Sequence, residues 1–241
     1  MTYLLPHIFT TLNIFFGFYA IVKVIDGDFF KASLGIFLAI FFDIFDGRIA
    51  RLFKIQSRFG LEYDSLCDLV SFGIAPALLI YQFSLKGFNK IGWSASFLYA
   101  TCVALRLARF NVKNLFKKSY FEGLPSPAGA GILASSVLFL LKTDIDPIYK
   151  TYGLLILTYL VAYLLVSPIQ YPSFKEFKIK KAQAFYFLVF FILGLTIIAS
   201  NPSFYLFIIF SFYLLLGPFL FFKNNRKNFF KNFTKKGTFK S

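Results

Sequence analysis

Apolar residues along this chain gather into long blocks that short polar stretches separate. Most blocks hold about 17 to 25 residues, the length that an α-helix needs to cross a hydrocarbon layer about 30 Å thick. The pattern therefore predicts an all-α integral membrane protein, a polytopic helical bundle of about eight transmembrane helices. The fifth block is short, and only the turn SNPS separates the last two. The expected spans are residues 6–25, 29–53, 61–83, 90–111, 127–142, 147–169, 182–200 and 202–222.

Composition agrees with this pattern. The 241 residues are 58% hydrophobic and 22% aromatic, and only 15% are charged. A soluble domain of this size with that composition would expose apolar surface and aggregate. Because no extended polar domain interrupts the blocks, we expect one membrane-embedded domain over residues 1–222. A basic cytoplasmic tail, flexible or lying on the surface, should follow over residues 223–241. The opening segment lacks the basic start and small-residue cleavage site of a signal peptide.

The net charge of +15 has a simple origin in the predicted topology. Most of the 26 lysines and arginines fall in the even-numbered loops and the tail, around residues 48–58, 106–118, 175–181 and 223–240. The positive-inside rule places these segments and both termini in the cytoplasm, which makes the chain a multi-pass protein of the cell (inner) membrane. Orientation explains the charge without any nucleic acid, and binding of anionic lipid headgroups is a secondary contribution.

Cysteine and histidine offer little chemistry in this sequence. Cys67 and Cys102 lie inside apolar segments, where we expect inert buried thiols. His7 stands at the cytoplasmic mouth of the first predicted helix. There an interfacial polar residue is the expected role, rather than a catalyst.

Acidic residues, in contrast, concentrate in one predicted helix-turn-helix. Its members are Asp43, Asp46, Glu62, Asp64 and Asp68. A loop of a few residues makes the two helices antiparallel neighbours, so that faces rich in aspartate can meet. On the first of these helices, one face is formed at spacing i, i+3, i+4, i+7 by Asp43, Asp46, Gly47 and Ala50. On the second, one face is formed at intervals of four by Gly60, Asp64 and Asp68.

Four carboxylates that meet near a membrane interior need a counter-charge. Each costs about 2.5 to 3.5 kcal/mol to insert, and the four also repel one another. Salt bridges to Arg48, Arg51 and Arg58 are one solution, but three arginines do not neutralise four carboxylates that share a face with glycines. One or two divalent cations would relieve the repulsion directly. Because every ligand is a hard oxygen and no histidine is near, we expect Mg²⁺ or Mn²⁺, with Ca²⁺ as a substitute or inhibitor.

The neighbouring residues indicate what such a metal centre would bind. Gly47, Ala50 and Gly60 would let a phosphate or nucleotide approach the helix backbones closely. Arg51, one turn beyond Gly47, is placed to pair with a phosphate. The centre lies at the cytosolic end of its two helices, so a reactant could keep a nucleotide in water and its tails in lipid.

At this point the spacing resembles the complete signature of the CDP-alcohol phosphatidyltransferase family. Within residues 43–68 every fixed position of that signature is filled at the right interval, by Asp43, Asp46, Gly47, Ala50, Arg51, Gly60, Asp64 and Asp68. The resemblance implies a reaction in which an alcohol displaces CMP from a CDP-linked lipid.

The resemblance also implies roles for the individual aspartates. A first metal would be bound by Asp43, Asp46 and Asp64, and a second by Asp43, Asp64 and Asp68. Asp68 would also be the general base that takes the proton from the acceptor hydroxyl. The CDP-lipid would be held by Gly47, Arg51, Ser57, Gly60 and Asn13. For Ser57, an N-cap of the third predicted helix is an alternative role.

Three further stretches resemble the phosphatidylserine synthase branch of the family. They are PHIFTTLNIFFGFYAI at 6–21, ALRLARFNV at 104–112 with FEGLPSPAGAG at 121–131, and VSPIQYPSFKEF at 166–177. In the first, His7 stands where the branch has asparagine. This resemblance implies CDP-diacylglycerol and L-serine as substrates and a homodimer as the expected assembly.

A clamp for a carboxylate-bearing acceptor is the physical counterpart of that resemblance. Arg106 and Arg109 lie one turn apart on one face, close to Asn111, at the cytoplasmic end of the fourth predicted helix. Two arginines there could hold the carboxylate of serine beside the diphosphate. The alternative is simple positive-inside charge at a helix end.

Two other functions compete with serine transfer. Glycerol phosphate or inositol phosphate could be the acceptor, since Arg106, Arg109 and Lys113 do not exclude a phosphorylated alcohol. A cation-coupled transporter would also carry carboxylates inside the membrane. Against a transporter, the acids lie near one surface and no broken helices occur at matching places in two halves. A catalytically dead relative is disfavoured because all four aspartates are intact.

Overall fold

The computed structural model describes residues 4–52, 57–113, 121–172 and 184–237, and nearly all of them are helical. Parts of several predicted segments, including residues 173–177 and 238–241, therefore lie outside the described residues. In chain order the elements are α1 (Leu4–Ile25), α2 (Phe29–Leu52), α3 (Arg58–Asp68), the π-helical η1 (Leu69–Ile74), α4 (Ala75–Phe83), the 3-10 turn η2 (Leu85–Phe88), α5 (Asn89–Lys113), β1 (Phe121–Glu122), α6 (Ser126–Leu141), α7 (Pro147–Val166), β2 (Gln170–Tyr171), α8 (Ala184–Ser200) and α9 (Pro202–Gly237).

The prediction of an all-α protein with several membrane helices is confirmed. Among the described residues, five helical stretches are long and apolar enough to cross a membrane, namely His7–Ile25, Arg58–Phe83, Leu85–Val112, Pro147–Val166 and Pro202–Phe221. The other long helix, α2, carries Asp43, Asp46 and Arg48 in its second half, while α6 and α8 have only 16 and 17 residues. The count of about eight spans stays a prediction, as does the orientation.

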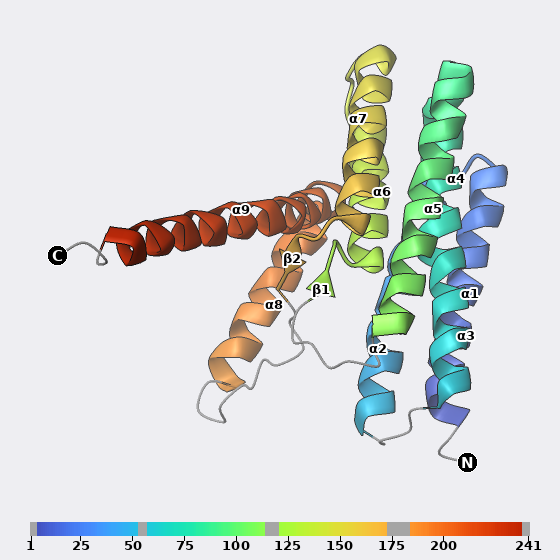
Figure 1. The fold of residues 1–241 in the computed structure, drawn as a ribbon. Coiled ribbons are helices and arrows are strands. Elements are labelled where there is room, and N and C mark those ends of the chain that lie inside the picture. The colour runs from blue at the N-terminus through green and yellow to red at the C-terminus, as the bar shows by residue number, and fades with distance from the viewer. Residues whose placement is uncertain (1–3, 53–56, 114–120, 173–183, 238–241) are drawn as a thin grey trace.

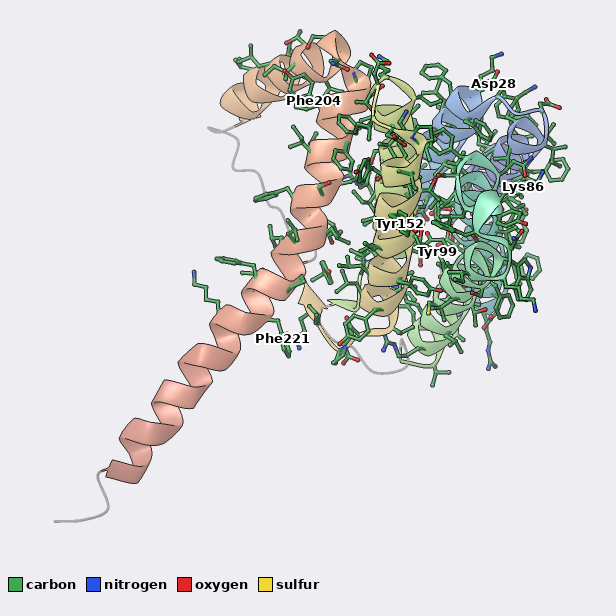
Figure 2. The ribbon with its side chains drawn as sticks, turned by 90° about the horizontal axis from the view of Figure 1, so that it is seen from above. Asp28, Lys86, Tyr99, Tyr152, Phe204 and Phe221 are labelled. Carbon is green, nitrogen blue, oxygen red and sulfur yellow. The ribbon has the colours of Figure 1, made fainter. Side chains whose placement is uncertain are left out.

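The helices form an upright bundle from which α9 departs. In Figure 1, α4, α5, α6 and α7 run side by side, α1 and α2 pack against them as a hairpin, and α9 extends away at a large angle. Figure 2 shows Phe204 beside the bundle and Phe221 farther along α9. The sequence predicted an end to the last helix near residue 222, but α9 continues to Gly237. No proline or glycine occurs between Pro218 and Gly237, so no strong helix breaker stands at the predicted end.

The third predicted span is one continuous helix with an irregular centre. Directly after Asp68 the backbone widens into the π-helical turns of η1, a feature that often occurs at functional sites. Two buried hydroxyls attach this segment to its neighbours. Tyr99 of α5 donates to the Phe72 carbonyl at 2.7 Å, and Ser71 donates to the Asn13 carbonyl of α1 at 3.0 Å. These hydrogen bonds fix the position of η1 along α1 and α5, and with it the position of the preceding helix α3, which carries Asp64 and Asp68.

The strands β1 and β2 form an antiparallel pair, which the sequence did not predict. This pair connects the segment before α6 to the segment after α7. Phe121 is opposite Tyr171, and Glu122 is opposite Gln170. Gly123 follows with φ +84, a left-handed conformation that glycine adopts without strain. The pair holds the start of α6 near the cytoplasmic end predicted for α5.

We predict that close packing between α1 and η1 limits the size of residue 17. A Cβ on Gly17 would stand 2.7 Å from the Cα of Ser71, so Gly17→Ala should destabilise the fold by about 1 to 3 kcal/mol. The matched control is Gly153→Ala, because no described atom lies within 4 Å of a Cβ there. Thermal unfolding in detergent measures both variants. Equal midpoints for the two would contradict the packing that we describe.

Candidate functional site

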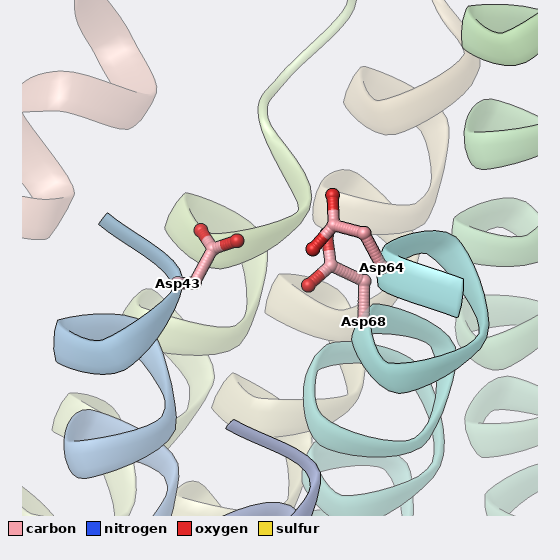
Figure 3. A group of neighbouring side chains, drawn as sticks. All are labelled: Asp43, Asp64 and Asp68. Atoms are coloured by element: carbon pink, nitrogen blue, oxygen red, sulfur yellow. The ribbon is translucent and has the colours of Figure 1, made fainter. Parts of the chain in front are cut away.

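Three carboxylates from two helices converge at one end of the bundle. Asp43 comes from α2 and Asp64 and Asp68 from α3, and one oxygen of each lies within 4.8 Å of the others (Figure 3). The helical spacing read from the sequence explains the convergence, since each helix directs its aspartates to the face that meets the other. Asp68 is buried, and the other two are half-buried. The predicted meeting of the two acidic faces is therefore present in the fold.

Asp46 lies beside this cluster but is not one of the three that share the 4.8 Å limit. Its side chain is only 6% exposed and interacts with Asp64, Asp43 and the Thr10 side chain. Oδ2 of Asp46 and Oδ1 of Asp64 are buried with no hydrogen-bond partner among the described residues. A buried acceptor without a partner costs about 1 to 3 kcal/mol, and more when charged.

These observations fit one or two divalent cations. The donors are carboxylate oxygens that carry like charges at short range, and two of them are buried with no hydrogen-bond partner in the part of the chain that the structure describes. Mg²⁺ and Mn²⁺ prefer such hard oxygen ligands and keep positions for substrate phosphate oxygens. Arg48 and Arg58, two of the three arginines considered as salt-bridge partners, are exposed, whereas Asp46 and Asp68 are buried.

Asn13 of α1 fixes the orientation of Asp68. It is fully buried, and its Nδ2 donates to Oδ1 of Asp68 at 2.9 Å. Its own Oδ1 is buried with no hydrogen-bond partner among the described residues, so the amide has a free acceptor beside the cluster. The sequence assigned Asn13 to the CDP-lipid, and the structure brings it directly to the proposed general base. The bond to Asp68 was not foreseen, because it joins residues 55 positions apart.

The small residues of the signature have different surroundings. At Gly47, no described atom lies within 4 Å of where a Cβ would stand, so the helix surface is accessible there. At Gly60, a Cβ would stand 3.0 Å from Cε1 of His7 and 3.1 Å from Oγ of Ser57. Ser57 caps α3, because its Oγ accepts from the Gly60 backbone N–H at 2.9 Å. The N-cap alternative for Ser57 is thus realised, and it leaves binding of the lipid as a prediction.

The ring of His7 packs against the first turns of α3. The imidazole makes edge-on contacts with Phe59 at 5.9 Å and Tyr63 at 6.3 Å between ring centroids. This aromatic contact occupies the space that Gly60 leaves. Arg51 and Ala50, the other signature residues of α2, lie in its last turns.

Arg106 is the predicted acceptor residue whose charge interacts with the carboxylates. Its side chain is 8% exposed, and Nη1 donates to Oγ of Ser126 at 2.8 Å. The guanidinium interacts electrostatically with Asp68 and Asp43, while its Nε is buried with no hydrogen-bond partner among the described residues. A buried guanidinium whose Nε–H has no partner among the described residues can donate to a bound anion. The segment GLPSPAGAG is conspicuous in the sequence, but the hydrogen bond from Arg106 to its residue Ser126 was not predicted.

Arg109 and Asn111 have other partners in this structure. Nη1 of Arg109 donates to the Val166 carbonyl at 3.0 Å, and Nη2 donates to the Glu122 carbonyl at 3.0 Å. Asn111 exchanges hydrogen bonds with Ser65 and donates to Glu62 at 3.2 Å. Arg109 therefore joins α5 to the strand pair and the end of α7, and Asn111 joins α5 to α3.

Comparison with known proteins agrees with the geometry. The model of the CDP-alcohol phosphatidyltransferase family matches residues 3–167, and the chain belongs to this family. It is thus a membrane-embedded transferase of phospholipid biosynthesis.

Its relatives include several proteins named CDP-diacylglycerol–serine O-phosphatidyltransferase. The Helicobacter pylori protein (strain ATCC 700392 / 26695) is 35% identical over 182 residues, 73% of this chain and 75% of the relative. The Bacillus subtilis protein is 36% identical over 172 residues, 71% of this chain and 92% of the relative. The Methanocaldococcus jannaschii protein is 36% identical over 165 residues, 68% of this chain and 72% of the relative.

We predict that Mn²⁺ alone binds the purified protein through the aspartate cluster. Replacing Asp64 by Asn removes one charged ligand and should weaken binding roughly tenfold or more, since carboxylate count sets affinity at such sites. Asp144→Asn is the matched control, because Asp144 is exposed in the turn between α6 and α7. Electron paramagnetic resonance of free Mn²⁺ gives both affinities. The same affinity in the two variants would place the metal elsewhere.

Proposed function

We propose that this protein transfers the phosphatidyl group of CDP-diacylglycerol to the hydroxyl of L-serine, giving phosphatidylserine and CMP. The observation that carries the proposal is a partly buried carboxylate cluster together with a buried arginine, Arg106, whose Nε has no hydrogen-bond partner among the described residues. The cluster suits a metal-bound diphosphate, and the arginine suits a carboxylate on the acceptor. The names of the relatives support the same donor and acceptor.

Two divalent cations, Mg²⁺ or Mn²⁺, are the proposed cofactors. Asp43, Asp46 and Asp64 would hold one, and Asp43, Asp64 and Asp68 the other. When bound, they would neutralise the diphosphate and stabilise the charge that gathers on the transferring phosphorus and on CMP.

Asp68 is the proposed general base. Its Oδ1 accepts from Asn13, so the carboxylate is held in one orientation toward the acceptor. In the reaction, the serine oxygen forms a bond to the phosphorus of the phosphatidyl group while the bond from that phosphorus to CMP breaks. The serine proton goes to Asp68, and CMP leaves with the bonding electron pair. Positioning of this kind makes proton transfer efficient.

The other predicted residues serve binding in this proposal. Gly47 offers an accessible backbone to the nucleotide, with Arg51 near the phosphates, and Ser57 and Gly60 form the adjoining helix start. Arg106 pairs with the carboxylate of serine. Arg109 and Asn111, predicted from sequence as further acceptor contacts, would support Arg106 by fixing the end of α5 to its neighbours.

The cellular setting is part of the proposal. The end of the bundle that carries the carboxylates would face the cytoplasm, where serine and CMP are soluble, in the inner membrane of the cell. Basic residues near that end support this orientation by the positive-inside rule. A homodimer is the proposed assembly.

The acceptor can be identified by CMP release. Purified protein with CDP-diacylglycerol and Mn²⁺ should release CMP with L-serine, and far more slowly with glycerol 3-phosphate or inositol phosphate. Arg106 is a single buried cation that matches a carboxylate better than a dianionic phosphate. Efficient release with a phosphorylated alcohol, and none with serine, would overturn the proposed acceptor. Cation flux in liposomes without any CMP release would favour a transporter.

Replacing Asp68 by Asn should abolish most turnover while preserving the fold. The amide keeps the volume but cannot take a proton, so kcat should fall by about 10² to 10⁴, the usual contribution of a general base. The control is Asp26→Asn. Asp26 is exposed in the turn between α1 and α2, where it pairs with Lys23, and this variant should keep wild-type turnover. Near-normal kcat in Asp68→Asn would assign the base to another residue.

A further inference from the structure

The helix that carries Asp64 and Asp68 changes its geometry directly after Asp68. At the end of η1 the backbone N–H of Ala75 donates to the carbonyl of Val70, five residues earlier, whereas a regular α-helix joins residues four apart. Regular α-helix resumes in α4. The two aspartates therefore lie on one side of a widened turn, and the rest of this membrane span lies on the other side.

A proline explains why the helix widens at this place. In a regular α-helix the ring of Pro76 would collide with the carbonyl of Phe72, four residues before it. Hydrogen bonds between residues five apart widen the helix and make room for the ring. Pro76 also has no N–H to donate. The carbonyl of Phe72 is thereby left without the donor that a regular helix would supply.

The hydroxyl of Tyr99 in α5 supplies a donor to that carbonyl. It donates to the Phe72 carbonyl at 2.7 Å, and both residues are fully buried. Buried main-chain groups need a hydrogen-bond partner, since leaving one without a partner is costly. The hydrogen bond from Tyr99 therefore stabilises the widened turn from a neighbouring helix.

Asn13 of α1 forms hydrogen bonds to both sides of the junction between α3 and η1. Its main-chain carbonyl accepts from Ser71 at 3.0 Å, and its side-chain amide donates to Asp68 at 2.9 Å. These two partners are three residues apart, so their relative directions depend on how tightly the helix is wound between them. If η1 became a regular α-helix, α3 would rotate about its axis relative to α4, and Asp64 and Asp68 would point elsewhere.

We propose that Tyr99 is a positioning residue for the metal centre. By donating to the carbonyl that Pro76 leaves without a helical donor, it maintains η1. The widened turn keeps Asp64 and Asp68 directed toward Asp43. This inference rests on the proposed function, because it treats these carboxylates as metal ligands. Residues that orient metal ligands without contacting the metal commonly change metal affinity by about 10- to 100-fold when they are replaced.

The test compares Tyr99→Phe with Tyr171→Phe. Tyr171 is a matched control, because its buried hydroxyl also donates to a main-chain carbonyl of another helix, that of Leu214 in α9. Each variant loses one buried hydrogen bond and should unfold at a lower temperature than the wild type. In Tyr99→Phe alone, the Mn²⁺ affinity should also fall by about 10- to 100-fold, and kcat for CMP release should fall with it. Equal Mn²⁺ affinities in the two variants would overturn the inference.

A second substitution separates positioning from stability. In the double variant Tyr99→Phe with Pro76→Ala, the new N–H at position 76 can donate to the Phe72 carbonyl, so the turn can become a regular α-helix. The unfolding temperature should then recover, while the Mn²⁺ affinity should stay low because the aspartates have rotated. Recovery of both quantities would show that Tyr99 acts on stability only, and would overturn the inference. The double variant also decides the question if Tyr99→Phe alone does not fold.

The wild type distinguishes failure of this inference from failure of the proposed function. A wild type that does not bind Mn²⁺ would overturn the proposed metal centre and this inference together. A wild type that binds Mn²⁺ no better than Tyr99→Phe does would overturn this inference alone. If the wild type binds Mn²⁺ but releases no CMP, the proposed reaction is wrong, and the Mn²⁺ affinities of the variants still decide whether Tyr99 positions the ligands.

Discussion

Mutual repulsion among buried carboxylates is the constraint on which the rest of this structure depends. Asp43, Asp64 and Asp68 place oxygens within 4.8 Å of one another, and Asp46 adds a fourth charge beside them. Burial in an apolar bundle strengthens that repulsion, so the aspartates would separate unless packing held them. Asn13, the bonded turns of η1 and the cap of α3 hold them in place. The cations proposed as cofactors would relieve this repulsion.

Two arginines of α5 have different roles because their hydrogen-bond partners differ. Arg106 and Arg109 are one turn apart on the same face, and the sequence pattern does not distinguish their roles. Arg109 donates to main-chain carbonyls beside the strand pair, which leaves it part of the scaffold. Arg106 donates to the hydroxyl of Ser126 at 2.8 Å and interacts electrostatically with the aspartates Asp68 and Asp43. The Nε of Arg106 has no hydrogen-bond partner among the described residues, which is why we propose Arg106 and not Arg109 as the acceptor contact.

The candidate site and α9 belong to different parts of the chain. The carboxylates, Asn13 and Arg106 all lie within the family match at residues 3–167. The helix α9 lies beyond it and packs closely against α6, where Phe210 meets Gly131, and against the strand pair, where Gly217 meets Tyr171.

The sequence by itself determined the helical class, the helix bounds to within a few residues at most ends, and the two acidic faces. These features follow from apolar block length and from the 3.6-residue period, both of which are local. Tertiary structure decided which groups meet across long separations, as with Asn13 and Asp68, Arg106 and Ser126, or Tyr171 and Gly217. Such contacts depend on the relative heights and rotations of helices, which packing sets. The local sequence pattern carries no record of them.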